Sequence, residues 1–203
     1  MRRIGLTGGI ASGKSSVARW IEAKGAPIID ADRLARDVTR PETSALRSIA
    51  TRWPQVIRAD GTLDRGWLGR VIFSDPTERA ALEAIVLPEI LDAFERWARE
   101  REAEGCPLAV FDAALLFEQD LDARFDGILL VAAPPELQIE RIVARDGLSP
   151  DEANARVAAQ LPLELKRPRA HWILENTGSI EALRDQFEAL WARVIGPSLV
   201  LKL

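Results

Sequence analysis

The sequence has few of the features that secreted and membrane proteins depend on. Its single cysteine, Cys106, cannot form an intramolecular disulfide or a zinc cluster, which fits a reducing compartment. The longest strongly apolar stretch, around Gly127 to Pro135, is far shorter than the roughly 20 residues of a membrane-spanning helix. Met1-Arg2-Arg3 is followed by glycines instead of the apolar segment of a signal peptide. We therefore expect a soluble, cytoplasmic protein.

An excess of positive charge is also missing. The 27 lysines and arginines are outnumbered by 31 aspartates and glutamates, so the net charge is −4. Such a balance does not favour a nucleic-acid partner, and any anionic ligand must be held by a local cluster of cations. The 203 residues, 47% hydrophobic and 29% charged, are enough for one compact domain with small insertions.

The hydrophobic pattern predicts an α/β fold in which a parallel sheet is flanked by helices. Two continuous apolar runs, at 108–112 and 127–132, are typical of parallel strands that are covered on both faces. The other expected strands are 3–7, 27–30 and 172–175, and the expected core helices are 14–24, 31–38, 136–145 and 180–195. Residues 42–104 contain no convincing strand, and we expect helices there, interrupted at Pro54, Asp60-Gly61, Asp75-Pro76 and Pro88.

The strongest motif is a glycine-rich loop between the first expected strand and the first expected helix. Gly8-Gly9-Ile10-Ala11-Ser12-Gly13-Lys14-Ser15 matches G-x-x-x-x-G-K-[ST], the phosphate-binding P-loop. Glycines let backbone N–H groups turn toward phosphate oxygens, and the helix N-terminus adds its dipole. We expect Lys14 to reach the β- and γ-phosphates and the Ser15 hydroxyl to ligate Mg²⁺. Ser16 completes the predicted nucleotide site.

Acidic residues follow two of the expected strands. Asp32 comes just after the second strand, where a small kinase places its acceptor, and its carboxylate can orient or deprotonate an attacking hydroxyl or help to hold the metal. Asp30 is expected to be a helix N-cap. Asp112 ends a buried strand, from which a carboxylate would approach Mg²⁺ through water, although aspartates at strand ends are also common loop formers.

Basic residues gather in the last third of the chain. Arg141 and Arg145 are four residues apart on one expected helix, so they share a face and can converge on phosphates, unless they are separate surface arginines. Lys166, Arg167 and Arg169 extend this set through a polar stretch. We expect residues 141–170 to form a lid that excludes water and brings positive charge to the transferred group.

Several further blocks, in this order, resemble the dephospho-CoA kinase family over most of the chain. They are Gly5-Leu6-Thr7-Gly8-Gly9-Ile10, Ile29-Asp30-Ala31-Asp32, Asp60-Gly61-Thr62-Leu63-Asp64-Arg65, Ile72-Phe73, Leu115-Leu116-Phe117-Glu118, Gln138 with Arg141 and Arg145, Gln160, and Asn176-Thr177-Gly178-Ser179. The resemblance implies a kinase core at 1–38, 105–140 and 171–203, a helical insertion that binds dephospho-CoA at 39–104, and the lid. It also implies phosphorylation of the ribose 3′-hydroxyl of dephospho-CoA with ATP and Mg²⁺.

The family's roles carry over to matching positions. By this resemblance Lys14 and Ser15 handle ATP and metal, Asp32 activates the acceptor hydroxyl, and Arg141 stabilises the transferring phosphate. Asn176 would lie near the adenine of ATP, with Arg145 toward the nucleotide end of the same cleft. The expected substrate contacts are Thr7, Asp32 and Leu116. The expected partners are the small molecules ATP and dephospho-CoA, without nucleic acid or membrane, and the chain is expected to be a monomer or small homo-oligomer.

Three positions depart from the family pattern. Leu87-Pro88 stands where a His-Pro pair is usual, Ala114 where proline is common, and His171 where an aspartate commonly precedes the last strand. These departures concern substrate contacts and leave the phosphate-binding residues intact. His171 is the only histidine, and we expect it to be structural rather than catalytic.

Other functions remain compatible with a P-loop alone. One is a different small-molecule kinase, acting on a nucleoside, a nucleoside monophosphate or shikimate. Another, of a different class, is a nucleotide-binding regulatory module without transfer activity, although the expected catalytic residues are all present. A GTPase switch would usually carry N-K-x-D after a late strand, where this chain has Glu175-Asn176-Thr177-Gly178. ATP is therefore favoured over GTP.

Overall fold

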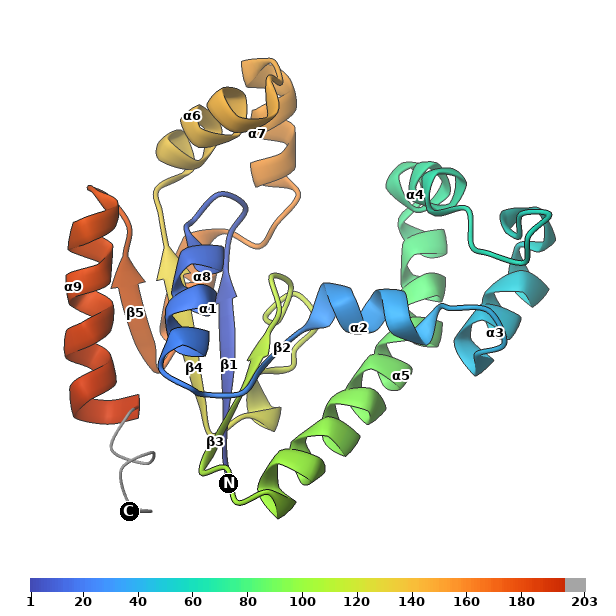
Figure 1. Ribbon diagram of the computed structural model, residues 1–203. Coiled ribbons are helices and arrows are strands. Elements are labelled where there is room, and N and C mark those ends of the chain that lie inside the picture. The colour runs from blue at the N-terminus through green and yellow to red at the C-terminus, as the bar shows by residue number, and fades with distance from the viewer. Residues whose placement is uncertain (196–203) are drawn as a thin grey trace. The chain divides into compact units, whose positions relative to one another are not determined.

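The computed structural model describes residues 1–195, and a five-stranded sheet forms the centre of the fold (Figure 1). The strand order is β2-β3-β1-β4-β5. The pairings of β1 with β3, of β1 with β4 and of β4 with β5 are parallel. The strands are β1 (Arg2–Gly8), β2 (Ile28–Asp30), β3 (Leu108–Asp112), β4 (Gly127–Ala132) and β5 (Trp172–Glu175). All five expected strands are therefore present, and β1, which leads into the glycine-rich loop, is the central one.

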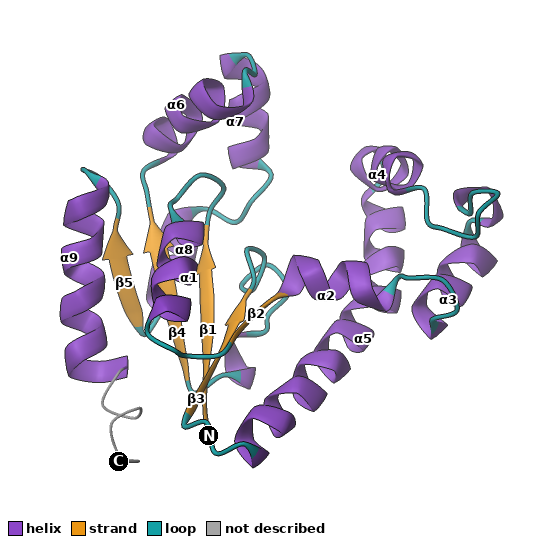
Figure 2. Ribbon diagram, viewed as in Figure 1, coloured by secondary structure: helices purple, strands orange, loops and turns teal. Residues whose placement is uncertain are grey.

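Helices connect the strands (Figure 2). They are α1 (Lys14–Ala23), α2 (Ala31–Val38), α3 (Ser44–Arg52), α4 (Arg65–Ser74), α5 (Pro76–Ala103), α6 (Pro135–Asp146), α7 (Pro150–Ala158), α8 (Leu163–Lys166) and α9 (Ile180–Leu190). Short 3₁₀ turns lie at η1 (Pro54–Val56), η2 (Asp122–Arg124) and η3 (Arg167–Arg169), and a π-helical turn, η4 (Trp191–Ile195), follows α9. Among the helices of residues 1–195, none combines the length and the apolar character needed to cross a bilayer.

The main core explains why β3 and β4 have no polar alternation. Every residue of both strands is buried, because helices cover the sheet. Val17 and Ile21 of α1 and Leu183 and Phe187 of α9 belong to one cluster with the apolar side chains of the strands. Each such side chain contributes about 1.5–3 kcal/mol when it is removed from water. The packing fixes α1, and with it the loop that precedes α1.

The chain divides into two compact units, Met1–Ile28 with the chain from Arg101 onward, and Ile29–Glu100. The second unit has its own apolar cluster around Ile49, Trp53 and Leu68. The start of α4 is capped by Asp64, whose carboxylate accepts a 2.8 Å hydrogen bond from the N–H of Trp67. The finer division into core, insertion and lid stays a prediction.

Two expectations about the helices were wrong. Pro88 was expected to interrupt the helical insertion, but α5 continues through it. Proline removes one backbone hydrogen bond, and here the burial of Leu91, Phe94 and Ala98 further along α5 outweighs that local loss. The last helix was expected to be regular to Ile195, whereas α9 ends at Leu190 and the next turn is π-helical.

Candidate active site

The glycine-rich loop joins the carboxyl end of β1 to the amino end of α1. Gly13 precedes the helix with a φ of 97°, which favours glycine, and a Cβ at this position would lie 2.4 Å from Nδ2 of Asn176. Lys14 and Ser15 form the first turn of α1, and Ser15 is exposed. The N-terminus of α1 thus lies at the end of the loop, where the motif predicts an anion site.

Arg141 and Asn176 hold the carbonyl groups of this loop from outside. Nδ2 of Asn176 donates to the Ser12 carbonyl at 2.8 Å, and one terminal nitrogen of Arg141 donates to the Ala11 carbonyl at 3.2 Å. The other terminal nitrogen of Arg141 donates to the backbone and side-chain oxygens of Asn176, both at 3.2 Å. Asn176 is buried. With its carbonyls held outward, the loop keeps its shape for phosphate before nucleotide arrives.

Two glutamines lie beside the other end of the loop. Oε1 of Gln160 accepts a 2.7 Å hydrogen bond from the N–H of Ile10. Gln138, buried on α6, donates from Nε2 to the Ala133 carbonyl at 2.6 Å, and its Oε1 lies 2.9 Å from the place where a Cβ on Gly9 would stand. These glutamines were predicted only as part of a family resemblance, without a role. Ile10 and Gln160 are 150 positions apart in the sequence, so no local pattern identifies their contact.

Lys14 forms an ion pair with Asp112. Asp112 ends β3 and is buried, while the Lys14 side chain is 21% exposed. The register of the sheet brings them together, because Leu6 of β1 pairs with Asp112. Asp112 thus lies beside the P-loop lysine, a position consistent with the expected metal site. The ion pair with Lys14 was not predicted.

The other predicted site residues are placed as follows. Thr7 is buried, and its hydroxyl donates to the Ala114 carbonyl at 3.3 Å. Leu116 is fully buried, and its expected contact with the substrate stays a prediction. Asp30 caps α2 as expected, since its carboxylate accepts from the N–H of Asp32 at 2.6 Å. Asp32 is exposed in the first turn of α2 and belongs to the second unit, so its role at the acceptor stays a prediction.

The basic residues expected to form a cationic lid are paired with carboxylates in this structure. Lys166 is buried with Nζ 2.7 Å from Oε1 of Glu118, an ion pair without hydrogen-bond geometry. Arg167 donates to Glu175 at 2.5 and 3.0 Å. Their positive charge is therefore offset locally in this structure, and the expected role of these residues in a lid stays a prediction.

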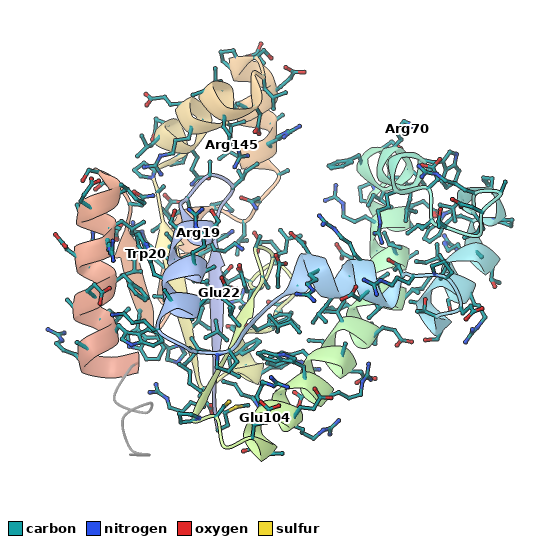
Figure 3. All side chains as sticks on the ribbon, in the orientation of Figure 1. Arg19, Trp20, Glu22, Arg70, Glu104 and Arg145 are labelled. Carbon is teal, nitrogen blue, oxygen red and sulfur yellow. The ribbon has the colours of Figure 1, made fainter. Side chains whose placement is uncertain are left out.

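Arg169 and Arg145 have similar partners. Arg169 donates to Asp122 and Asp120 and to the Phe117 carbonyl, and its hydrogen bond lowers the pKa of Asp122. Arg145, labelled on α6 in Figure 3, donates twice to Asp146, at 2.7 and 2.9 Å. These hydrogen bonds raise the pKa of Arg145 and lower that of Asp146.

His171 has the structural role that was expected. Its Nδ1 accepts a 3.2 Å hydrogen bond from the backbone N–H of Ile128, and the backbone N–H of His171 donates to the Ile128 carbonyl at 3.0 Å. Nδ1 is therefore unprotonated, and the ring secures the start of β4 against the start of β5.

A P-loop between the central strand of a parallel sheet and its first helix, with a lysine and a strand-end aspartate beside it, defines the class of P-loop nucleotide-binding proteins, which includes the small-molecule kinases. The family model of dephospho-CoA kinase matches residues 2–182. A dephospho-CoA kinase from Anaeromyxobacter dehalogenans is 47% identical over 197 residues, covering 97% of this chain and 93% of the relative. The chain belongs to the dephospho-CoA kinase family.

Solved structures agree with this assignment. A crystal structure from Thermus thermophilus is 41% identical with a TM-score of 0.78, covering 95% of this chain and 97% of the other. A dephospho-CoA kinase from Campylobacter jejuni is 25% identical with a TM-score of 0.71, covering 95% and 96%. The similarity extends over nearly the whole length of each chain.

Proposed function

We propose that this chain transfers the γ-phosphoryl group of ATP to the ribose 3′-hydroxyl of dephospho-CoA, which yields coenzyme A. The observation that carries the proposal is the preformed loop, in which Arg141 and Asn176 hold the Ala11 and Ser12 carbonyls outward beside Lys14. Membership of the dephospho-CoA kinase family supports the choice of acceptor.

ATP binding requires Lys14 to exchange one partner for another. Its ammonium faces Asp112 in this structure, and the β- and γ-phosphates offer it a stronger negative charge. The movement would break the ion pair of Lys14 with Asp112. The exposed Ser15 hydroxyl and this carboxylate are both oxygen donors, which suits Mg²⁺. When bound, Mg²⁺ would neutralise charge on the phosphates, with Ser15 and Asp112 as the residues that hold it.

We assign Asp32 to the acceptor. The 3′-oxygen attacks the γ-phosphorus, the bond to the β–γ bridging oxygen breaks, and ADP leaves. The proton of the hydroxyl passes to the Asp32 carboxylate, which also orients the attack. In this assignment residues 39–104 bind the rest of dephospho-CoA, and residues 141–170 act as the lid.

Arg141 has donors left for the transferred group. A guanidinium carries five N–H groups, and three hydrogen bonds from its two terminal nitrogens serve Ala11 and Asn176. A remaining N–H can face the γ-phosphoryl group while the others hold the loop. Arg141 would then shape the phosphate site and stabilise charge in the transition state.

The test is ADP release from ATP and Mg²⁺ with dephospho-CoA as acceptor, with the product identified by its mass. We expect turnover that depends on dephospho-CoA and a product heavier by one phosphate. Nucleosides, nucleoside monophosphates and shikimate serve as control acceptors. Equal or faster turnover with one of these would replace the proposed acceptor, and ATP binding without any turnover would indicate a regulatory module.

A further inference from the structure

A cavity of about 340 Å³ lies beside the Gly9 end of the P-loop, within the first unit. Its walls come from the start of α6, from α7 and from the segment between α7 and α8. Val131, Ala133, Val157, Leu161 and Leu163 supply apolar surface, and Gln138 and Gln160 supply amide groups. Its size falls at the lower end of the range of small-molecule pockets, about 300–1,000 Å³, and mostly apolar walls with a few fixed polar groups are typical of such pockets.

The two glutamines each use one half of the side-chain amide and leave the other half free. Nε2 of Gln138 is bound to the Ala133 carbonyl and Oε1 of Gln160 to the Ile10 N–H. Within residues 1–195, Oε1 of Gln138 and Nε2 of Gln160 make no hydrogen bond. Gln138 is 6% exposed, so its orientation is fixed by packing. Beside the P-loop, the two glutamines therefore offer the cavity one hydrogen-bond acceptor and one donor.

The charge of the cavity argues against a phosphate group as its ligand. Lys166 belongs to the lining, but it is 2% exposed and its charge is offset by Glu118. A flat, largely apolar group with a donor and an acceptor on its edge fits better. Adenine has such an edge, because its 6-amino group donates and a neighbouring ring nitrogen accepts, and glutamine amides pair with this edge elsewhere.

We propose that this cavity binds the adenine of the acceptor, an inference that rests on the proposed function. The P-loop has two ends, and Asn176 contacts it at Ser12, toward Gly13, where the family resemblance puts the adenine of ATP. The cavity adjoins the other end, at Gly9 and Ile10. A purine bound there belongs to the molecule whose 3′-hydroxyl receives the phosphoryl group, since that hydroxyl is on the same nucleoside.

A pair of substitutions on α7 tests the proposal. Ala158 lines the cavity and Ala155, on the same helix, does not, and both are exposed. We expect Ala158→Phe to raise the KM for dephospho-CoA about tenfold or more by filling the cavity, with the KM for ATP unchanged. Ala155→Phe should leave both values as in the wild type. Val157→Phe fills the cavity from a second position, if Ala158→Phe fails to fold.

The outcomes separate this inference from the proposed function. Unchanged KM values in folded Ala158→Phe and Val157→Phe would overturn the cavity as an acceptor site, while the proposed function would stand. A rise in the KM for ATP, with or without a rise in the KM for dephospho-CoA, would assign the cavity to the donor side. A binding measurement needs no turnover. Adenosine titrated into the ADP-saturated protein should bind the wild type and Ala155→Phe equally and Ala158→Phe about tenfold more weakly. Equal binding by all three would refute the inference.

Discussion

The side chain of Asn176 donates a 2.8 Å hydrogen bond to the Ser12 carbonyl, across 164 residues of sequence. Oδ1 of the same side chain accepts from Arg141, which also donates to Ala11. One buried amide thus connects the end of β5 to the P-loop and to α6. Removal of this connection should alter the loop without altering the residues that touch phosphate.

We expect Asn176→Ala to raise the KM for ATP and lower kcat, because the Ser12 carbonyl loses the donor that holds it. A buried group left without its partner costs about 1–3 kcal/mol, so the melting temperature should fall by several degrees. Thr177→Ala, at an exposed neighbour, is the matched control. Steady-state kinetics and thermal melts measure both effects, and kinetics equal to those of the control would show that the loop needs no such support.

Lys14→Ala should nearly abolish transfer while the protein stays folded. Lys14→Arg should fail as well, because the loop suits a compact ammonium and a planar guanidinium has a different shape. The ion pair adds a prediction about stability, since the lysine leaves behind a buried carboxylate. Lys14→Ala/Asp112→Asn should recover the lost melting temperature but not the activity. A double variant as unstable as Lys14→Ala would mean that the pair is not what stabilises this region.

Asp32→Asn should lower kcat far more than it weakens ATP binding, because its carboxylate acts on the acceptor hydroxyl or the metal. Asp30→Asn is the matched control, because it makes the same change two residues away and asparagine can also cap α2. Initial rates at varied ATP and dephospho-CoA separate the two effects. A variant changed only in its KM for ATP would contradict the assignment.

Arg141→Ala and Arg145→Ala should differ. Arginines on the transferred group are worth about 10³ or more in kcat in phosphoryl-transfer enzymes generally, and Arg141 also holds the P-loop. We expect a steep loss of kcat for Arg141→Ala, with some rise in the KM for ATP. Arg145 is exposed and paired with Asp146, so Arg145→Ala should affect ATP binding only. An intact kcat in Arg141→Ala would make it a ground-state binding residue.

The hydrogen bond of Asp122 with Arg169 predicts a dependence of stability on pH. It lowers the pKa of Asp122 from the ordinary 3.8, so the folded state binds that proton less readily than the unfolded state does. The stabilisation is therefore complete above the ordinary pKa and is lost as the pH falls through the lowered value. The difference in melting temperature between wild type and Asp122→Asn should therefore stay constant above about pH 5 and shrink as the pH falls below about 4. A constant difference would exclude this carboxylate as the cause.

Local patterns predicted much of this structure. Continuous apolar runs identified β3 and β4, and the motif placed the P-loop before α1 because glycine, lysine and helix start are adjacent in sequence. Asp30 was predicted as an N-cap for the same reason. Each of these features depends on neighbouring residues.

Features that depend on tertiary contacts could not be predicted. The basic residues after α6 were interpreted as a source of positive charge in a lid. Lys166 contacts Glu118 and Arg169 contacts Asp122 only after the chain has folded. The hydrogen bond of Gln160 to Ile10 joins residues 150 positions apart. Pro88 stays inside α5 because packing further along the helix outweighs its local preference. In each case the deciding contact is a tertiary one, which the neighbouring sequence does not reveal.

The contacts that shape the P-loop come late in the chain. The loop is complete by Ser15, yet the side chains that form hydrogen bonds with it belong to Arg141, Gln160 and Asn176. During synthesis, which proceeds from the N-terminus, the loop therefore leaves the ribosome long before its supports do. A nascent chain that ends before β5 carries the whole motif but lacks the shaped phosphate site. ATP affinity is thus acquired near the end of translation, when most of the sheet is already in place.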